Sequence, residues 1–316
     1  MRVVVFAAGA IGSLLGASLA HAGHTVLLVG RPDHVAAIRA EGLRITGSLV
    51  ETVELRAESS VPPDFAPEAI LLTAKTFDLP GAASLLGIEV PDPVPTLLPQ
   101  NGLGVEETVL TAFSASGWMH PERWLVRAVN TVPATLVGPG AVRAAGQGEI
   151  VLGRARAPAA EATRTLLRLL RSTEIPVRTV EHLERELWRK AILNAAINPV
   201  TALHGVPNGR LLEEPYRTES TALLDEALAT ARAVGMEFRE KEVRADFERV
   251  VRATAENRSS MLQDLDRGRR TEIQAISGEI LREGTAKGLE LPATRRVVDA
   301  IRARSPGGAL ARGEVS

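Results

Sequence analysis

The spacing of apolar and polar residues divides the chain into two differently patterned parts. Up to about residue 178, short apolar runs typical of strands alternate with helical or turn segments, and beyond it apolar residues recur at helical spacing. Strands that alternate with helices predict a parallel, doubly wound sheet, whereas a helical period predicts amphipathic helices. We therefore expect an α/β domain over residues 1–178, followed by an all-α domain over residues 179–316.

The individual elements follow from the same pattern. Strands of the parallel sheet are predicted at residues 3–6, 25–29, 69–73, 96–98 and 125–129. Two later runs punctuated by glycines, residues 142–144 and 149–152, are predicted as antiparallel strands at the edge of that sheet. Helices are predicted at residues 181–204, 215–234, 240–255, 271–288 and 292–303, each bounded by Gly, Pro or Asn. The tail from about residue 305 is rich in glycine and has no periodic face, so we expect it to be loose.

Length and composition agree with two domains. The chain has 316 residues, and an ordinary domain has about 100 to 200. Hydrophobic residues make up 45% of the sequence and charged residues 24%, which excludes wholesale disorder. Because the formal net charge is −1 and no block of like charge occurs, we expect no broad nucleic-acid-binding face.

Cysteine usage and the N-terminal sequence narrow the class of protein further. The chain contains no cysteine, so disulfides, thiolate metal sites and cysteine nucleophiles are excluded, and no metal is expected. The first residues enter a strand-like run without the layout of a signal peptide, and no uncharged apolar run reaches about 18 residues. We expect a soluble cytoplasmic protein with no membrane partner.

Lysine and asparagine are both scarce, which draws attention to the positions where they occur. Basic positions are almost all arginine, and the four lysines are Lys75, Lys190, Lys241 and Lys287. The six asparagines are Asn101, Asn130, Asn194, Asn198, Asn208 and Asn257. Arginine and lysine are not interchangeable in chemistry, so these residues are enriched for positions where another side chain would not serve.

The first strand leads directly into a glycine-containing turn. Residues 3–6 are followed by Ala7, Ala8, Gly9, Ala10, Ile11 and Gly12, and then by a helical segment. This is the layout of a Rossmann-like dinucleotide-binding turn, in which glycines admit the pyrophosphate to the N-terminus of a helix. A strand–helix turn without a ligand is the alternative. Ala7 replaces the first glycine of the motif and can follow the usual backbone path if its φ is negative.

The end of the second strand points to the type of dinucleotide. Many NAD-binding proteins place an acidic residue there for the ribose hydroxyls, but this sequence has Arg31 after Gly30. A guanidinium can form a bidentate pair with an additional phosphate, so Arg31 favours NADP(H). The alternative is that Arg31 is an ordinary exposed arginine.

One predicted helix carries a row of polar residues. Lys190, Asn194 and Asn198 are spaced at i, i+4 and i+8 and share one helix face. Small and apolar residues flank the row, which indicates a partly buried location, and buried polar groups need partners. A polar substrate could be that partner, or the asparagines could bond to loops of the chain while Lys190 is solvated. Residues 256–264 read by themselves as a helix junction with good caps.

Taken together, the motifs resemble the ketopantoate reductase (2-dehydropantoate 2-reductase) family over nearly the whole chain. The segments that carry the resemblance are residues 7–12, 71–75, 100–104, 187–190, 194–199, 207–209, 256–264 and 271–272. The family reduces 2-dehydropantoate with NADPH to (R)-pantoate, a precursor of pantothenate and coenzyme A. The resemblance therefore implies an NADP-dependent oxidoreductase that acts on a small keto acid.

The resemblance also implies roles for individual residues. Lys190 is similar to the proton donor of the family, and Glu272 to a residue near the nicotinamide and that lysine. The implied substrate contacts are Asn101, Asn194, Asn198, Asn208, Asn257 and Ser260. The implied cofactor contacts are Ala7, Ala8, Gly9, Ala10, Ile11, Gly12, Arg31, Lys75, Asn101, Ala134 and Glu272.

The sequence departs from the family at three positions and leaves two alternative functions open. Ala7 replaces a glycine, Ala144 stands where many members have histidine, and Ser277 stands where asparagine often precedes glycine. The same plan serves oxidoreductases of other small 2-keto or 3-hydroxy acids, and a non-catalytic NADP-binding sensor could keep the fold. Retention of both Lys190 and Glu272 argues against a sensor. A homodimer is one assembly that the sequence allows without determining it.

Overall fold

The computed structural model describes residues 1–306, and these form two compact units. Unit 1 comprises Met1–Gln100 and Val105–Leu183, and unit 2 comprises Asn101–Gly104 and the chain from Glu184 onward. The predicted division after residue 178 is therefore displaced, because it falls inside strand β12 (Val177–Val180), which pairs with a strand of unit 1. Most of the tail expected to be loose, residues 307–316, lies outside the described residues.

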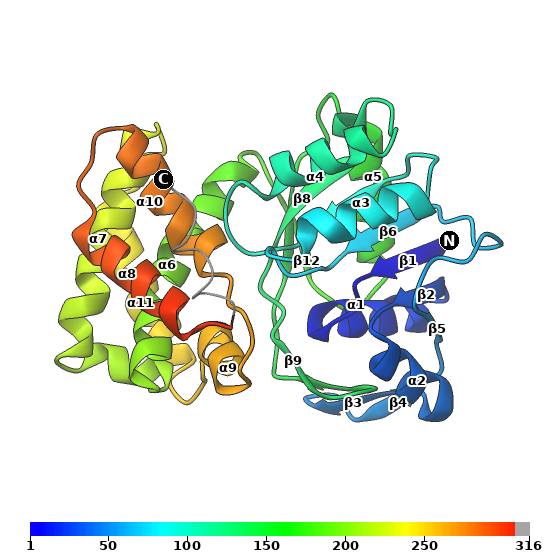
Figure 1. Ribbon diagram of the computed structural model, residues 1–316, viewed down its shortest axis with the longest axis horizontal. Helices are drawn as coiled ribbons and strands as arrows, with labels where there is room; N and C mark the ends of the chain where they lie inside the picture. Colours follow the sequence, from blue (N-terminus) through cyan, green and yellow to red (C-terminus); the bar gives the residue numbers. More distant parts are fainter. Residues whose placement is uncertain (307–316) are drawn as a thin grey trace, which may run out of the picture. The chain divides into compact units, whose positions relative to one another are not determined.

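The main sheet of unit 1 has the strand order β12-β11-β8-β7-β6-β1-β2-β5 (Figure 1). The remaining strands are β1 (Arg2–Phe6), β2 (Thr25–Val29), β5 (Arg56–Glu58), β6 (Ala69–Leu72), β7 (Thr96–Leu98), β8 (Leu125–Asn130) and β11 (Ile150–Gly153). The six strands from β8 to β5 pair in parallel, and β11 runs antiparallel to β8. The five predicted parallel strands are confirmed. Because β1 has β2 on one side and β6 on the other, the order of the strands reverses at β1, which is where doubly wound sheets bind ligands.

Both faces of the sheet are covered, as the continuous apolar strands require. Val3 and Val5 of β1 belong to one apolar core, with helices α1 (Ala10–His21) and α5 (Ala160–Arg171). Val4 and Phe6 face the opposite core, with α3 (Leu79–Glu89) and α4 (Val105–Ala115). The period-2 alternation of side chains along a strand thus supplies both layers of the α/β sandwich.

A second sheet corrects one of the predicted strands. Its order is β4-β3-β10-β9, formed by β3 (Leu43–Gly47), β4 (Glu51–Val53), β9 (Ala134–Gly138) and β10 (Ala141–Ala144). The run at residues 142–144 was expected at the edge of the main sheet, but it pairs with β3 and β9 because the apolar face of this sheet packs on α1. The run at residues 149–152 forms β11, which is antiparallel to β8 as predicted, although β12 lies outside it.

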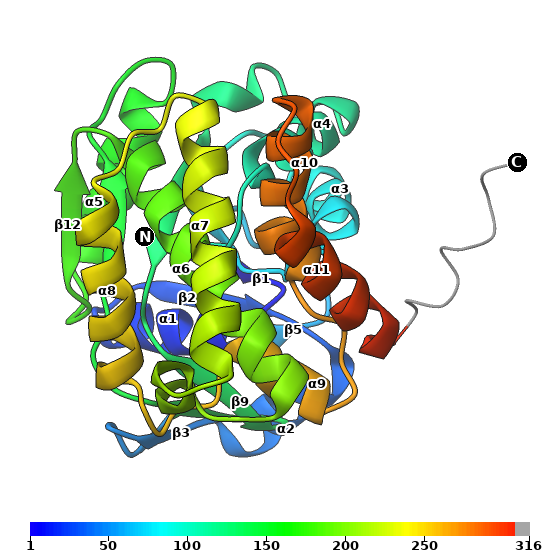
Figure 2. The same cartoon turned by 90° about the vertical axis from the view of Figure 1, so that its left-hand side faces the viewer.

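Unit 2 is helical, as predicted. Its elements are α6 (Leu183–His204), η2 (Asn208–Leu212), α7 (Tyr216–Ala233), α8 (Glu240–Ala253), α9 (Ser260–Asp266), the π-helical turn η3 (Gln274–Gly278), α10 (Glu279–Ala286) and α11 (Pro292–Arg304). Figure 2 shows α7, which packs against α10 and α11. Ile192, Ala196 and Val200 of α6 lie fully buried in the core of this unit. The remaining short elements are α2 (Pro32–Glu41) and the 3₁₀ turn η1 (Pro121–Arg123), both in unit 1.

Candidate active site

The turn after β1 has the shape of a dinucleotide-binding turn, with one difference from expectation. β1 ends at Phe6, α1 begins at Ala10, and Gly9 is the N-cap residue. The expected negative φ at Ala7 is wrong, because its φ is 59°. Ala7 therefore occupies the left-handed region that a glycine would enter without strain.

The two remaining glycines of the turn fit a bound dinucleotide. A Cβ built on Gly9 would meet no heavy atom within 4 Å, so the backbone there is open to an approaching group. A Cβ on Gly12 would lie 2.3 Å from Thr73 Oγ1, so this glycine allows α1 to pack closely against the sheet. No side chain caps the N-terminus of α1 at Gly9, and unpaired N–H groups at a helix N-terminus favour an anion such as a pyrophosphate.

Arg31 and Lys75 lie at the carboxyl ends of strands in unit 1. Arg31 is the exposed N-cap residue of α2, and its Nη2 lies 4.0 Å from Oδ2 of Asp78. An exposed ion pair of this length is weak, so the guanidinium can turn to a phosphate. Lys75 follows β6 and is half-buried. Ala134 is the first residue of β9.

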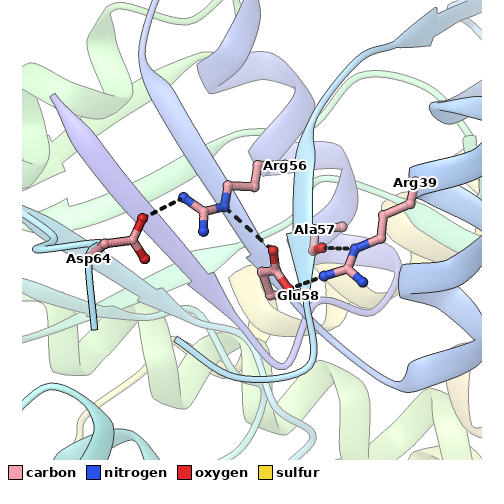
Figure 3. Close-up of polar contacts among 5 residues, drawn as sticks. All are labelled: Arg39, Arg56, Ala57, Glu58 and Asp64. Atoms are coloured by element: carbon pink, nitrogen blue, oxygen red, sulfur yellow. Dashed lines mark hydrogen bonds and ion pairs between the residues drawn. The ribbon is translucent and has the colours of Figure 1, made fainter. Parts of the chain in front are cut away.

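An acidic side chain does occur near the end of β2, but arginines hold it. Gly30 donates its N–H to the carbonyl of Glu58 at 3.1 Å. Figure 3 shows that the carboxylate of Glu58 is paired with Arg39 of α2 and with Arg56, whose Nε lies 3.6 Å from Glu58 Oε1. Arg56 also reaches Asp64, at 3.5 Å. Glu58, the acidic residue of β5 beside the end of β2, is thus already paired with arginines.

Helix α6 presents the predicted polar row in unit 2. Lys190 and Asn194 are half-buried, and Asn198 is buried. The row therefore runs from the partly exposed first half of the helix into the core. Sequence spacing predicted the shared face, and the structure confirms the helix on which it depends.

Asn101 and Glu272 are brought together although 171 positions separate them in the chain. Asn101 Nδ2 donates to Oε2 of Glu272 at 3.2 Å, and Glu272 is buried. The segment that carries Asn101 is anchored to the π-helical turn, because Leu103 N–H donates to Ala275 O at 2.9 Å. Gly102 has φ 85°, and a Cβ there would lie 2.2 Å from the same carbonyl. Asn101 follows a strand of unit 1 but belongs to unit 2.

The remaining predicted substrate contacts lie around a helix junction. Asn208 is buried, donates through Nδ2 to Thr254 Oγ1 at 2.9 Å, and donates its backbone N–H to Asn257 O at 2.9 Å. Within the described residues, Asn208 Oδ1 is a buried acceptor without a hydrogen-bond partner, which suits a polar ligand. Asn257 is exposed.

The cap predicted in this segment is confirmed at the residue before Ser260. Ser259 is the N-cap of α9 and accepts a hydrogen bond from Leu262 N–H at 3.2 Å. Thr201 Oγ1 lies 2.7 Å from Ser259 Oγ and 3.0 Å from Asn198 O. The hydroxyl of Thr201 therefore connects the end of the α6 row to the start of α9. Ser260 is exposed at that start.

Sequence reasoning missed three residues that shape the cofactor side. Thr73 and Gln100 make side-chain hydrogen bonds to carbonyls at the carboxyl ends of β1 and β6, and both lie in segments that carried the family resemblance. His34 is buried, and its Nδ1 accepts from Gly140 N–H at 2.9 Å while its Nε2 lies 3.0 Å from Ser13 Oγ. Burial lowers the pKa of His34, against a smaller opposing effect of Asp33. No local pattern marks such contacts, because their partners are distant in sequence.

A buried arginine also lies in the middle of β8, beside the end of β7. Arg127 of β8 donates through Nη1 to Leu98 O at 3.2 Å, and burial lowers its pKa to about 10. It remains a cation at neutral pH. Among residues 1–306, no group of three His, Asp or Glu side chains is arranged to hold a metal ion. No helix in the same range is long and apolar enough to cross a membrane.

Comparison with known proteins agrees with this arrangement in both units. The family model described as "Ketopantoate reductase PanE/ApbA" matches residues 3–157, and "Ketopantoate reductase PanE/ApbA C terminal" matches residues 182–305. The 2-dehydropantoate 2-reductase of Archaeoglobus fulgidus is 34% identical over 302 residues, covering 95% of this chain and 97% of the relative. That of Pyrococcus abyssi is 31% identical over 294 residues, covering 92% and 94%.

Solved structures show the same similarity. A PanE/ApbA family ketopantoate reductase from Ralstonia eutropha superposes with a TM-score of 0.86 at 31% identity, covering 98% of this chain and 100% of that chain. The fold is shared more widely, since D-mandelate dehydrogenase with NADH and anilino(oxo)acetate has a TM-score of 0.88 at 22% identity, with 98% and 99% covered. With both family models matched in order and relatives above 30% identity along nearly the full length, this chain belongs to the ketopantoate reductase family.

Proposed function

We propose that this protein reduces 2-dehydropantoate to (R)-pantoate with NADPH, in the biosynthesis of pantothenate and coenzyme A. The observation that carries the proposal is the polar face of α6, where Lys190, Asn194 and Asn198 run into the core of unit 2. The hydrogen bond from half-buried Asn101 to buried Glu272 supports it. A protein that only bound the cofactor would not need the polar row on α6.

The residues of unit 1 are proposed to hold the cofactor. The open backbone at Gly9 and the uncapped start of α1 suit the pyrophosphate, and Ala134 is proposed as a backbone contact. Arg31 and Lys75 are proposed to bind the adenosine 2′-phosphate. The pairing of Glu58 with Arg39 and Arg56 supports NADPH over NADH, because that carboxylate is already neutralised. When bound, the nicotinamide supplies the hydride that converts the ketone to an alcohol.

The residues of unit 2 are proposed to bind and protonate the keto acid. Reduction of a ketone builds negative charge on its oxygen, so a positioned proton donor stabilises the transition state. Lys190 is the proposed donor, and Glu272 is proposed to orient it. Asn101 keeps the Glu272 carboxylate in place by donating to it.

Recognition of the substrate is assigned to neutral groups. Amides do not titrate near neutral pH, so Asn194, Asn198 and Asn208 are proposed to orient the substrate hydroxyl rather than transfer protons. Asn208 Oδ1 is a buried acceptor suited to that hydroxyl. Asn257 is a further proposed substrate contact, and Ser260 is the proposed contact for the carboxylate.

Consumption of NADPH with 2-dehydropantoate and close analogues tests the proposal. We expect oxidation of NADPH by 2-dehydropantoate at a higher kcat/KM than by analogues that lack the hydroxyl or the geminal methyl groups. Preference for another 2-keto acid would reassign the substrate and leave the reaction class intact. Binding of NADPH without turnover of any keto acid would refute an enzymatic role.

A further inference from the structure

The hydroxyl of Thr73 joins the adjacent strands β6 and β1 at their carboxyl ends. Thr73 is the first residue after β6, and its N–H donates to Phe6 O of β1 at 2.9 Å. Its Oγ1 lies 3.1 Å from Phe6 O and 3.3 Å from Ala7 O. Because a hydroxyl has one proton, this is a single bond shared between two carbonyls. Both carbonyls belong to the start of the cofactor turn.

The same hydroxyl also contacts the far side of that turn. A Cβ on Gly12 would lie 2.3 Å from Thr73 Oγ1, so the first turn of α1 packs directly against it. Thr73 thus contacts the turn at two places. One is Ala7, where the backbone is left-handed, and the other is Gly12. The left-handed conformation is unfavourable for alanine, so contacts of the neighbouring peptide must hold it. Thr73 supplies one of them.

Gln100 fixes the segment that carries Thr73. Its Nε2 donates to Leu72 O at 2.6 Å and lies 3.3 Å from Ala74 O, the two carbonyls that flank Thr73. Both acceptors are carbonyls, which identifies the amide nitrogen as the group that faces them. Gln100 is buried, so the amide is shielded from water. The Gln100 side chain, which follows β7, therefore fixes the backbone path of residues 72–74.

We propose that Thr73 and Gln100 are positioning residues of the cofactor site, which hold the Ala7–Gly12 turn in the shape that receives the dinucleotide. Neither residue needs to touch the cofactor. The inference rests on the proposed binding of NADPH by this turn. Without the Thr73 hydroxyl, Ala7 O loses its side-chain donor, and the left-handed residue relaxes toward negative φ. That change would move Gly9 and the start of α1.

Replacement of Thr73 by valine removes the hydroxyl and keeps the shape of the side chain. We expect Thr73→Val to weaken NADPH binding about two- to tenfold, the range set by loss of one neutral hydrogen bond. The KM for 2-dehydropantoate at saturating NADPH should stay within about twofold of the wild-type value, because the substrate contacts lie in unit 2. Thr73→Ser restores the hydroxyl and should restore the NADPH affinity.

Thr163→Val is the matched control. Thr163 is buried in α5 of the same unit, and its hydroxyl donates to Ala159 O at 2.8 Å, away from the turn. Both valine variants lose a hydrogen bond to a carbonyl, so thermal unfolding should show comparable losses of stability. Only Thr73→Val should weaken NADPH binding, as measured by calorimetric titration. Equal weakening in both variants would overturn the proposal, because it would show general destabilisation.

Gln100→Leu supplies an independent route if Thr73→Val does not fold. It removes the amide that holds residues 72–74, and we expect it to weaken NADPH binding as well. If both variants fold, the weakening in the double variant should be less than the product of the single effects, because the two side chains act on one segment. Wild-type affinity in Thr73→Val or Gln100→Leu, or no rescue by Thr73→Ser, would refute the inference.

Gly9→Ala separates failure of this inference from failure of the proposed cofactor site. Gly9 has φ −98°, and its Cβ would meet no protein atom within 4 Å. The variant should therefore fold as the wild type does and still bind NADPH at least about tenfold more weakly, because the methyl occupies the space of the pyrophosphate. Unaltered binding by Gly9→Ala would place the cofactor elsewhere. If Gly9→Ala weakens NADPH binding and Thr73→Val does not, the cofactor site stands and only the positioning role of Thr73 is rejected.

Discussion

Ala7→Gly tests the backbone geometry of the cofactor turn directly. Ala7 has φ 59°, and this conformation costs a residue with a Cβ about 1–2 kcal/mol, a strain that glycine does not carry. Against this gain, the greater conformational entropy of glycine in the unfolded chain lowers the free energy of unfolding by about 0.4–1 kcal/mol. The half-buried methyl also contributes part of the ~0.8 kcal/mol of a fully buried carbon. The net result is a protein between unchanged and about 1 kcal/mol more stable.

Ala8→Gly is the matched control for this prediction. Ala8 is the next residue, it is buried, and its φ is not positive. Glycine there relieves no strain, and it loses a buried methyl while freeing the unfolded chain, so we expect a loss of about 1–2 kcal/mol. The two substitutions are chemically identical and adjacent, but their effects on the free energy of unfolding should differ by at least about 1 kcal/mol.

Urea unfolding of both variants measures that difference, and thermal unfolding provides a second readout. A change of 1 kcal/mol shifts the Tm of a domain of this size by about 2–4 °C. Equal destabilisation by Ala7→Gly and Ala8→Gly would refute the left-handed assignment of Ala7. NADPH affinity in Ala7→Gly should change by less than about 1 kcal/mol, since glycine can keep the same backbone path.

Three further predictions concern chemistry, cofactor choice and pH. Lys190→Ala should lower kcat for 2-dehydropantoate about 10²- to 10⁴-fold while NADPH still binds, and Lys190→Arg should recover little because a guanidinium keeps its proton; near wild-type kcat in steady-state assays would exclude Lys190 as the donor. Arg31→Ala should weaken NADPH by about 1–3 kcal/mol more than NADH, through loss of a charge-assisted bond to phosphate; equal losses in titrations with both cofactors would contradict that role. Burial lowers the pKa of His34 below its ordinary value of 6.5, and protonation of Nδ1 removes the acceptor for Gly140 N–H. The stability from neutral His34 should therefore be complete above about pH 6.5 and decline as the pH falls through the lower folded-state pKa. Urea unfolding at several pH values should show a smaller decline in His34→Asn, whose carbonyl accepts without titrating; the same decline in both proteins would rule out His34 as its source.

Local pattern was sufficient for the elements whose residues are neighbours in the chain. The apolar runs at residues 3–6 and 25–29 predicted strands of a parallel sheet, and the helical period after residue 181 predicted α6 and the helices that pack around it. The shared face of Lys190, Asn194 and Asn198 follows from helix geometry alone. Ser259 is recognisable as a cap because its partner, Leu262 N–H, lies three positions away.

Only the tertiary structure decided which of these pieces meet. The run at residues 142–144 is apolar enough for either sheet, and its pairing with β3 depends on packing against α1, which no local pattern encodes. Asn101 follows a strand of unit 1 in the sequence, but Ala275 and Glu272 hold its segment in unit 2. Such contacts join residues about a hundred or more positions apart, and spacing along the chain carries no information about them.

The cofactor turn shows the same division at the scale of single atoms. The order of strand, glycines and helix is local, so the sequence was enough to predict where the turn lies. Neighbouring residues do not determine the conformation of Ala7. The preference of alanine for negative φ is opposed by the contact that Thr73, which follows the neighbouring strand β6, makes with the Ala7 carbonyl. The left-handed conformation costs alanine about 1–2 kcal/mol. The combined stabilisation from several packed and hydrogen-bonded neighbours can exceed this cost.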